Sequence, residues 1–350
     1  MIEILVAMVI GLIGIIIITQ AYLVSDNFNK ATLGEGGAQV NGLIGLYSME
    51  RDARMAGYGI NHTTALACAE ADWYYNGSYS PNINPSTTLK NIVIAPFYIT
   101  VSGTASTPDQ VTVMFSSDSE RAVPTSVVSF SSAIPEMRVD GVTGFTVGDI
   151  VLIAKRVTTG ACSMAKVTSV NTSSSILQFL SGSTALNNPA AWGNLTSGYT
   201  TNDVIYNLGT PSVRTYLVSA NKLQMYDAFT LAVGTAAVDV VDGVVDLRAQ
   251  YGKDTDADGD VDVWNTTTPT TSAEWQQVTV VRMALLSRIG NYEKPTSGTN
   301  CDATTASNVP TWAGGSFAAI DVSTVTSQDR CYRYRSFETT VPLRNMIWKQ

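Results

Sequence analysis

The sequence predicts an α+β protein in which one long N-terminal helix is followed by an antiparallel, β-rich globular domain. Three observations predict it. The first 24 residues are almost purely apolar, the residues up to 58 keep a helical pattern, and short alternating segments fill much of the remainder. We therefore expect a helical unit at 1–58, with an apolar half at 1–24 and an amphipathic half at 25–58, and a β-rich domain at 59–350.

The apolar run at the N-terminus is long enough to cross a membrane. From Ile4 to Val24 only Thr19 and Gln20 break it, apart from two glycines. About 20 helical residues, at about 1.5 Å each, span the hydrocarbon core of a bilayer. No basic residue precedes the run and no Ala-x-Ala site follows it, so we expect a retained helix rather than a cleaved secretory signal. The one charged residue in this part is Glu3.

The second half of the helix is expected to be amphipathic. Apolar residues at i, i+3, i+4 and i+7 place one apolar face on it, formed by Val40, Leu43, Ile44 and Tyr47. Glu50 and Arg54 make a favourable i, i+4 pair, and glycines at 57 and 59 end the helix. We expect this half to pack on the globular domain.

Composition excludes one class of function. The net charge is −8, only 14% of residues are charged, and no cluster of Lys and Arg occurs. Binding to a phosphate backbone therefore lacks its electrostatic basis, and we expect no nucleic-acid partner.

Four widely spaced cysteines in a chain with export features predict two disulfides. Four cysteines allow three connectivities, and the sequence alone does not choose among them. We favour Cys68–Cys162 and Cys301–Cys331, because the second pair brackets one loop rich in Ser, Thr and Gly. Buried free thiols are the alternative.

Strand patterns begin after a turn-rich stretch at 60–95. Strands are predicted at 109–115, 149–154, 164–170 and 332–341, and a hairpin at 214–219 and 222–226. Residues 240–251 are expected to form a short helix or turn that enters a strand, and residues 275–288 a long strand.

An Asp-rich turn at 254–265 predicts a calcium loop. Asp254, Asp256 and Asp258 occupy positions 1, 3 and 5 of such a loop, and Gly259 occupies the tight-turn position 6. Asp260 would offer its backbone carbonyl at position 7, and Asp262 falls at position 9. Hard oxygen ligands favour a structural Ca²⁺ over Zn²⁺. Asn265 replaces the usual bidentate Glu at position 12, and a solvated acidic turn without an ion is the alternative.

No catalytic motif stands out, and we expect a protein that is not an enzyme. His62 is the single histidine and lies in a turn-rich stretch, where a surface loop residue is the expected role. No Gly-x-Ser-x-Gly, Gly-x-Gly-x-x-Gly or P-loop occurs. A sugar-binding or adhesive surface is an alternative role for several aromatic residues, namely Trp73, Tyr74, Tyr75, Tyr79 and Trp192.

The chain resembles the type IV pilins and their pseudopilin relatives, in which a Glu lies at the start of an apolar helix. Its second half is similar to the PilW branch of minor pilins. The residues that carry this likeness are the helix end at 51–58, the Gln-Tyr-Gly at 250–252 with the Asp-rich turn after it, the Trp275-led segment, and the closing Arg335, Phe337, Val341 and Leu343 to Asn345.

The resemblance implies a structural subunit of a type IV pilus or related filament. Its partners would be other pilin subunits and the inner-membrane assembly machinery. It would be anchored in the membrane before assembly and lie in an extracellular filament afterwards. Glu3 would pair with the N-terminal amine of a neighbouring subunit, against the alternative of an interfacial Glu that reaches the lipid headgroups.

Two other classes of function stay open at this point. One is a membrane-anchored surface adhesin or carbohydrate-binding protein. The other is a pseudopilin of a type II secretion system.

Overall fold

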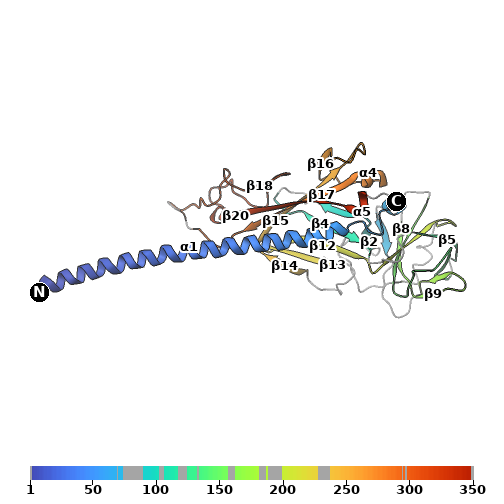
Figure 1. Cartoon of the computed structure of the whole chain (residues 1–350), viewed down its shortest axis with the longest axis horizontal. Helices are drawn as coiled ribbons and strands as arrows, with labels where there is room; N and C mark the ends of the chain where they lie inside the picture. Colours follow the sequence, from blue (N-terminus) through green and yellow to red (C-terminus); the bar gives the residue numbers. More distant parts are fainter. Residues whose placement is uncertain are drawn as a thin grey trace.

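A computed structural model describes residues 2–347 except 69, 74–89, 102–105, 117–123, 132–133, 157–161, 181–186, 188–198, 228–236, 294 and 296–297. It confirms the α+β class: helix α1 (Ile2–Met55) is followed by sheets in which nearly all neighbouring strands are antiparallel. Figure 1 shows the first half of α1 as a rod that projects from the domain, with the N-terminus at its free end. The helix is continuous through its glycines at 11, 14, 34, 36 and 37.

Two sheets pack around the second half of α1. The first has the strand order β14-β13-β12-β4-β3. Its strands are β3 (Phe97–Thr100), β4 (Gln110–Phe115), β12 (Ser212–Ser219), β13 (Lys222–Asp227) and β14 (Val238–Asp242). The second has the order β16-β15-β17-β20. Its strands are β15 (Val244–Lys253), β16 (Val263–Asn265), β17 (Val278–Arg288) and β20 (Tyr334–Pro342).

A third sheet, of nine described strands, lies beyond the end of α1 (Figure 1). Its order is β2-β1-β8-β7-β11-β5-β6-β10-β9, and β1 and β8 form its one parallel pair among the described strands. The strands are β1 (Glu70–Trp73), β2 (Lys90–Val93), β5 (Thr125–Phe130), β6 (Glu136–Val139), β7 (Ile150–Ala154), β8 (Cys162–Lys166), β9 (Ser169–Asn171), β10 (Ile176–Gln178) and β11 (Val204–Gly209). Alternate residues of β7 face two different apolar clusters, as expected for a sheet buried on both faces.

Short elements complete the described chain. They are α2 (Thr63–Leu66), α4 (Ser272–Gln277), the hairpin strands β18 (Thr311–Trp312) and β19 (Gly315–Ser316), the 3₁₀ helix η2 (Gln328–Cys331) and α5 (Arg344–Ile347).

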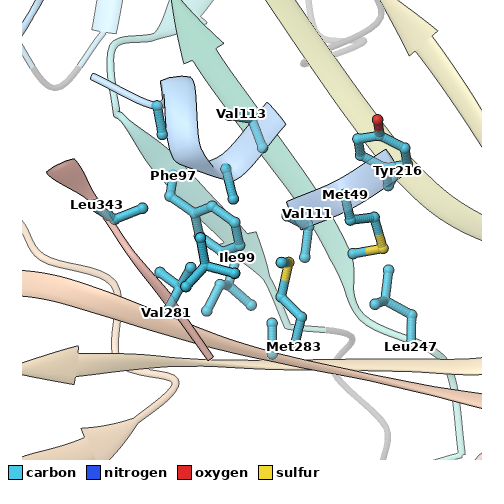
Figure 2. Close-up of a cluster of buried hydrophobic side chains, with 14 of the residues drawn as sticks. Met49, Phe97, Ile99, Val111, Val113, Tyr216, Leu247, Val281, Met283 and Leu343 are labelled. Carbon is cyan, nitrogen blue, oxygen red and sulfur yellow. The ribbon is translucent and has the colours of Figure 1, made fainter. Parts of the chain in front are cut away.

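The largest core lies where α1 meets the two sheets that surround it. Figure 2 shows Met49 of α1 among Val111 of β4, Tyr216 of β12 and Met283 of β17. Alternate residues of each strand point into this core, in the period of two that a pleated strand imposes. The second half of α1 is therefore part of the domain core.

The predicted strands at 109–115, 149–154 and 332–341 match β4, β7 and β20 within two residues, and the strand predicted at 164–170 starts at 162 and ends at 166. The predicted hairpin is β12–β13, and its turn residues Ala220 and Asn221 both have positive φ, as a two-residue hairpin turn requires.

One expectation about secondary structure is wrong. Trp275 lies in helix α4 and not in a strand, because Thr271 and Glu274 form a Thr-x-x-Glu capping signature. The Thr271 side chain accepts a hydrogen bond from Glu274 N, and the Glu274 carboxylate accepts one from Thr270 N at 2.6 Å. Of the two expectations for residues 240–251, the turn is confirmed and the helix is not: Gly243, at φ +81°, joins β14 to β15.

We predict that Gly42→Ala destabilises the fold, whereas Gly36→Ala does not. A Cβ on Gly42 would lie 2.3 Å from the ring of Phe337, whereas one on Gly36 meets nothing within 4 Å. Overpacking costs about 1–3 kcal/mol, while an exposed helical Gly→Ala change gains up to about 1 kcal/mol. Melting of the full chain in detergent micelles should therefore shift in opposite directions for the two variants. Equal shifts would contradict this packing.

Candidate functional site

The first half of α1 is an apolar surface without a covering partner in the described chain. Val6–Leu23 is long and apolar enough to cross a membrane, and none of it is buried. Glu3 lies one turn before it and is exposed. Thr19, the hydroxyl within the apolar run, donates to Ile15 O at 2.7 Å, so the helix itself satisfies this polar group.

The second half of α1 has two faces of opposite character. The face toward the domain carries small or medium residues, and they are Ala38, Gly42, Gly45, Leu46, Met49 and Ala53. The residues expected from the sequence to form the apolar face, Val40, Leu43, Ile44 and Tyr47, are instead 47–67% exposed. We call these four residues the outer stripe.

The outer stripe corrects the simplest reading of the helical pattern. Residues 40 and 42 are two positions apart, so their side chains point in nearly opposite directions around a helix. Close approach of the strands selects glycine at 42 and 45, because a Cβ on Gly45 would lie 3.0–3.1 Å from Leu223, Leu285 and Val241. A face that is formed by glycines cannot be found by looking for large apolar residues at helical spacing.

One buried carboxylate fixes α1 to the five-stranded sheet. Asp52 is fully buried, and Arg214 of β12 donates to its two carboxylate oxygens at 2.9 and 3.1 Å. Tyr216 donates to Asp52 Oδ2 at 2.7 Å. Arg214 also contacts Asp227 of β13 at 3.4 Å, and its guanidinium lies over the ring of Phe115. The carboxylate is therefore paired and hydrogen-bonded, as a buried charge must be.

The protonation of this cluster follows from its surroundings. Burial raises the pKa of Tyr216, and the neighbouring charge of Asp52 raises it further, so the phenol stays protonated and donates. Burial alone would lower the pKa of Arg214, but its hydrogen bond and charge interaction with Asp52 outweigh burial, so the pKa is raised. Arg214 is therefore a fixed cation at the helix.

The closing segment of the chain caps the C-terminus of α1. Asn345 donates through Nδ2 to the carbonyl oxygens of Met55 and Ala56 at 3.1 and 3.0 Å. The last carbonyls of a helix have no partner within the helix, so a side-chain donor there is stabilising. Gly57, at φ +80°, turns the chain and donates to Met114 O at 2.9 Å. No local signal in the sequence indicates this role, because Asn345 and the end of α1 are about 290 residues apart.

The Asp-rich turn connects β15 to β16 as a hairpin loop. Asp254, Asp256 and Asp262 each place a carboxylate oxygen within 4.8 Å of the others. Asp254 accepts from Ala257 N and Gly259 N at 2.6 and 3.0 Å, and both of these residues have positive φ. The loop is thus folded around the Asp254 carboxylate.

Asp258 and Asp262 accept hydrogen bonds from other residues of the turn and thereby stabilise it. Asp258 accepts from Asp260 N at 2.8 Å. Asp262 accepts from Thr255 Oγ1 and Thr255 N, both at 2.7 Å, and these hydrogen bonds lower the pKa of its carboxyl. Asp262 therefore stays ionised at neutral pH.

Three carboxylates of the loop are grouped as Ca²⁺ ligands would be, but the residue at position 12 is not among them. Three carboxylates converge as hard-cation chemistry requires. Asn265 lies three residues beyond Asp262 and pairs with Tyr251 in the ladder between β15 and β16. The extended strand therefore places Asn265 about 10 Å from Asp262. Its Oδ1 accepts from Thr267 N at 3.1 Å. A helix leaving the loop would bring position 12 back toward the ion, whereas this strand does not.

The structure joins Cys68 to Cys162 and Cys301 to Cys331, which is the pairing favoured from the sequence. The first disulfide ties the segment after α2 to β8. The second closes the long connection between β17 and β20, part of which packs on the four-stranded sheet.

Other singled-out residues do not converge on one site. His62 is half-buried at the start of α2, with its ring 5.6 Å from that of Tyr206, so the expected surface position is wrong. Tyr74, Tyr75, Tyr79 and Trp192 lie outside the described residues, and only the backbone of Trp73 is described.

The C-terminal part of the chain is similar to a known family. Residues 205–345 match the family described as Type IV Pilus-assembly protein W, which confirms the PilW likeness over this part. The match runs from β11 to the Asn345 cap and supports a pilus-related structural subunit. A solved type IV-like pilin from Thermus thermophilus aligns over 86% of this chain and 94% of its own, at 10% identity and a TM-score of 0.35. No curated protein matches the sequence.

We predict that Asp52→Asn loosens the helix from the domain. The change leaves Arg214 without its main counter-charge in a partly buried site, and breaking such a pair costs about 3 kcal/mol. Arg51→Gln is the matched control, because Arg51 also lies 3.4 Å from Asp52 but its side chain is 58% exposed; exposed pairs contribute less than about 1 kcal/mol. Denaturant unfolding of the full chain in micelles measures both. An equal loss in the free energy of unfolding for Asp52→Asn and Arg51→Gln would contradict the assignment of Asp52 as the residue that anchors the helix.

Proposed function

We propose that this chain, matched to the pilus-assembly protein W family over residues 205–345, is a minor subunit of a type IV pilus. It assembles through α1 with other pilin subunits, after release from the inner membrane by the assembly machinery. The observation that carries the proposal is the exposed apolar surface of the projecting half of α1, and the outer stripe is a second exposed apolar patch on the same helix, beside the domain.

The size of this surface requires a non-aqueous partner. Large apolar side chains from Ile4 to Leu23 are more than half exposed in the described chain. Burial of each such side chain stabilises by about 1.5–3 kcal/mol. The sum exceeds the whole stability of a typical domain, about 5–15 kcal/mol. A bilayer would cover the first half before assembly, and neighbouring helices would cover it afterwards.

The outer stripe favours assembly over simple anchoring. An anchor needs only the apolar half of the helix, whereas the outer stripe lies beside the globular domain, beyond the reach of the hydrocarbon core. Its four side chains face away from the domain, where a neighbouring subunit can pack on them. The same feature weighs against an adhesin whose helix serves as an anchor alone.

Glu3 would set the register between subunits. A carboxylate in an apolar environment costs up to about 2.5–3.5 kcal/mol, and a neighbouring N-terminal amine would offset that cost. Glu3 is exposed, near the free end of the projecting half of α1, so a neighbouring subunit can reach it.

We predict that Glu3→Gln prevents incorporation into filaments while the subunit still accumulates in the membrane. Gln removes the charge that would pair with the amine but keeps the size of the side chain. Glu35→Gln on the same helix is the control, because Glu35 makes only an exposed contact with Arg335 at 3.5 Å. Immunoblots of sheared filaments and membranes measure the distribution. Normal incorporation of the Glu3 variant would indicate an anchored protein instead.

The outer stripe supplies a second arm of this experiment. Leu43→Ser combined with Tyr47→Ser should leave melting of the full chain unchanged, since both side chains are exposed, yet reduce incorporation. Unchanged incorporation would show that neighbouring subunits do not use this face. Loss of an exported enzyme with intact filaments would instead indicate a secretion pseudopilin.

We also propose that the loop at 254–262 binds a structural Ca²⁺ through the carboxylates of Asp254, Asp256 and Asp262. The grouping of these carboxylates supports the proposal, because like charges this close repel one another unless a cation neutralises them. The ion would hold the β15–β16 hairpin, whose strand β16 lies at the edge of its sheet.

We predict opposite effects of Asp256→Asn with and without calcium. In Ca²⁺ the variant should melt below the wild type, because one charged ligand is lost; in excess chelator it should melt above it, because repulsion is relieved. Asp321→Asn is the control, since Asp321 also accepts backbone N–H groups in a turn, at 3.0 and 3.1 Å. Wild-type melting that is identical in Ca²⁺ and chelator would exclude the ion.

A further inference from the structure

The four-stranded sheet has a second face that points away from α1. On β17, Val281, Met283 and Leu285 enter the core around α1, so Val280 and Arg282 lie on the opposite face. We call this the outer face. The connection between β17 and β20 covers one end of it, where Phe317 and Ile320 pack on Ala284 and Leu286.

Beside this covered end lie two tryptophans and an arginine, and one of them, Trp312, belongs to the same connection, with its ring centroid 6.4 Å from that of Phe317. The Arg282 guanidinium carbon lies 3.9 Å from the ring centroid of Trp264 and 6.0 Å from that of Trp312. Trp264 comes from β16, Arg282 from β17 and Trp312 from β18, so side chains of three separate segments meet here. We call Trp264, Arg282 and Trp312 the Trp–Arg–Trp patch.

Glycines make room for both rings of the patch. A Cβ on Gly252, the ladder partner of Trp264, would lie 2.9 Å from the indole. A Cβ on Gly314 would lie 2.3 Å from the indole of Trp312. Each ring therefore lies directly against the backbone, and both rings stay half-buried rather than fully covered.

Polar groups of the patch lack partners within the described chain. Arg282 has no carboxylate within ion-pair distance there, and its Nε is buried without a hydrogen-bond acceptor. Gln250, the ladder partner of Arg282, has a buried Oε1 that is likewise unsatisfied among the described residues. On the other side of Arg282, Thr340 is exposed. Unsatisfied buried groups are rare in folded proteins, and each one calls for an explanation.

We propose that the Trp–Arg–Trp patch binds a saccharide that carries a carboxylate. The axial C–H groups of a sugar ring pack on the negative face of an indole. Trp312 offers this face, because the Arg282 guanidinium already covers the ring of Trp264 at 3.9 Å. A guanidinium matches a carboxylate in bidentate geometry through two parallel N–H···O bonds. Gln250 and Thr340 lie in the same row as Arg282 and supply groups for the sugar hydroxyls.

The charge of the chain makes this recognition short-ranged. The net charge is −8, and the acidic loop at 254–262 begins beside Trp264, so an anionic polymer is not attracted from a distance. Affinity then depends on contact with Arg282 itself. An acidic peptide could use the same guanidinium but has no sugar ring to lie on the indole of Trp312, which is why the saccharide is favoured.

The experiment compares three probes on the full chain in detergent micelles. Tetragalacturonic acid carries both the rings and the carboxylates, its methyl ester carries the rings alone, and tetraglutamate carries the carboxylates alone. Titration calorimetry should show binding of the acid at least about tenfold tighter than of either other probe, since a hydrogen-bonded charge pair contributes that much.

Variants locate the site on the chain. Arg282→Gln should weaken binding of the acid about tenfold. Arg288→Gln is the matched control and should bind as the wild type does, because Arg288 lies on the same strand and also stacks on an aromatic ring, that of Tyr332, at 4.4 Å. Trp312→Phe keeps an aromatic packing group on the hairpin and should weaken binding less than Arg282→Gln does, with unchanged melting.

Three results would overturn the proposal. They are the absence of binding of tetragalacturonic acid, equal affinity for its methyl ester, and tetraglutamate binding as tightly as the acid. Equal losses in Arg282→Gln and Arg288→Gln would also overturn it, by showing that any exposed cation suffices. Because the outer face lies away from α1, none of these results depends on filament assembly.

Discussion

The structure depends on one constraint: the second half of a membrane-length helix must lie inside a β-rich domain. Asp52 meets this constraint one turn before the end of the helix, because its buried carboxylate is compensated by Arg214 and Tyr216 from the facing sheet. Asn345 completes it by capping the last carbonyls of α1. These contacts join the first 55 residues to strands more than 150 residues later in the chain, so the helix and the domain cannot move independently without breaking a buried ion pair.

The packing of one face of α1 on the domain decides which residues its opposite face exposes. The glycines at 42 and 45 let two sheets approach the helix closely, and this turns Val40, Leu43, Ile44 and Tyr47 outward. The outer stripe is thereby a second apolar patch on the same helix, separated from the apolar first half by the largely polar residues 25–39. One rigid element therefore carries two apolar surfaces, which suits a subunit that is held in a bilayer first and among other helices later.

The fold class, the helix limits and several strands could be predicted from the sequence, because hydrophobic periods and turn residues are local signals. The disulfide pairing could only be favoured, since it joins residues 94 and 30 positions apart. The face of α1 that meets the domain could not be predicted, since glycine contributes nothing to a hydrophobic pattern and its value at 42 depends on Phe337, far away in the chain. The helix at Trp275 does have a local signal, which Thr271 and Glu274 carry. The roles of Asp52 and Asn345, and the meeting of Trp264, Arg282 and Trp312, exist only in the folded chain, because each joins segments that are distant in sequence.

The central claim is that this chain enters a filament through α1. It is tested most directly by quantitative mass spectrometry of filaments sheared from cells, with subunit ratios, beside the membranes left behind. The account predicts that the chain is present in the sheared filaments at a small fraction of the main subunit and that its deletion removes the filaments. Absence from the sheared filaments, with the whole pool retained in the membrane, would contradict it.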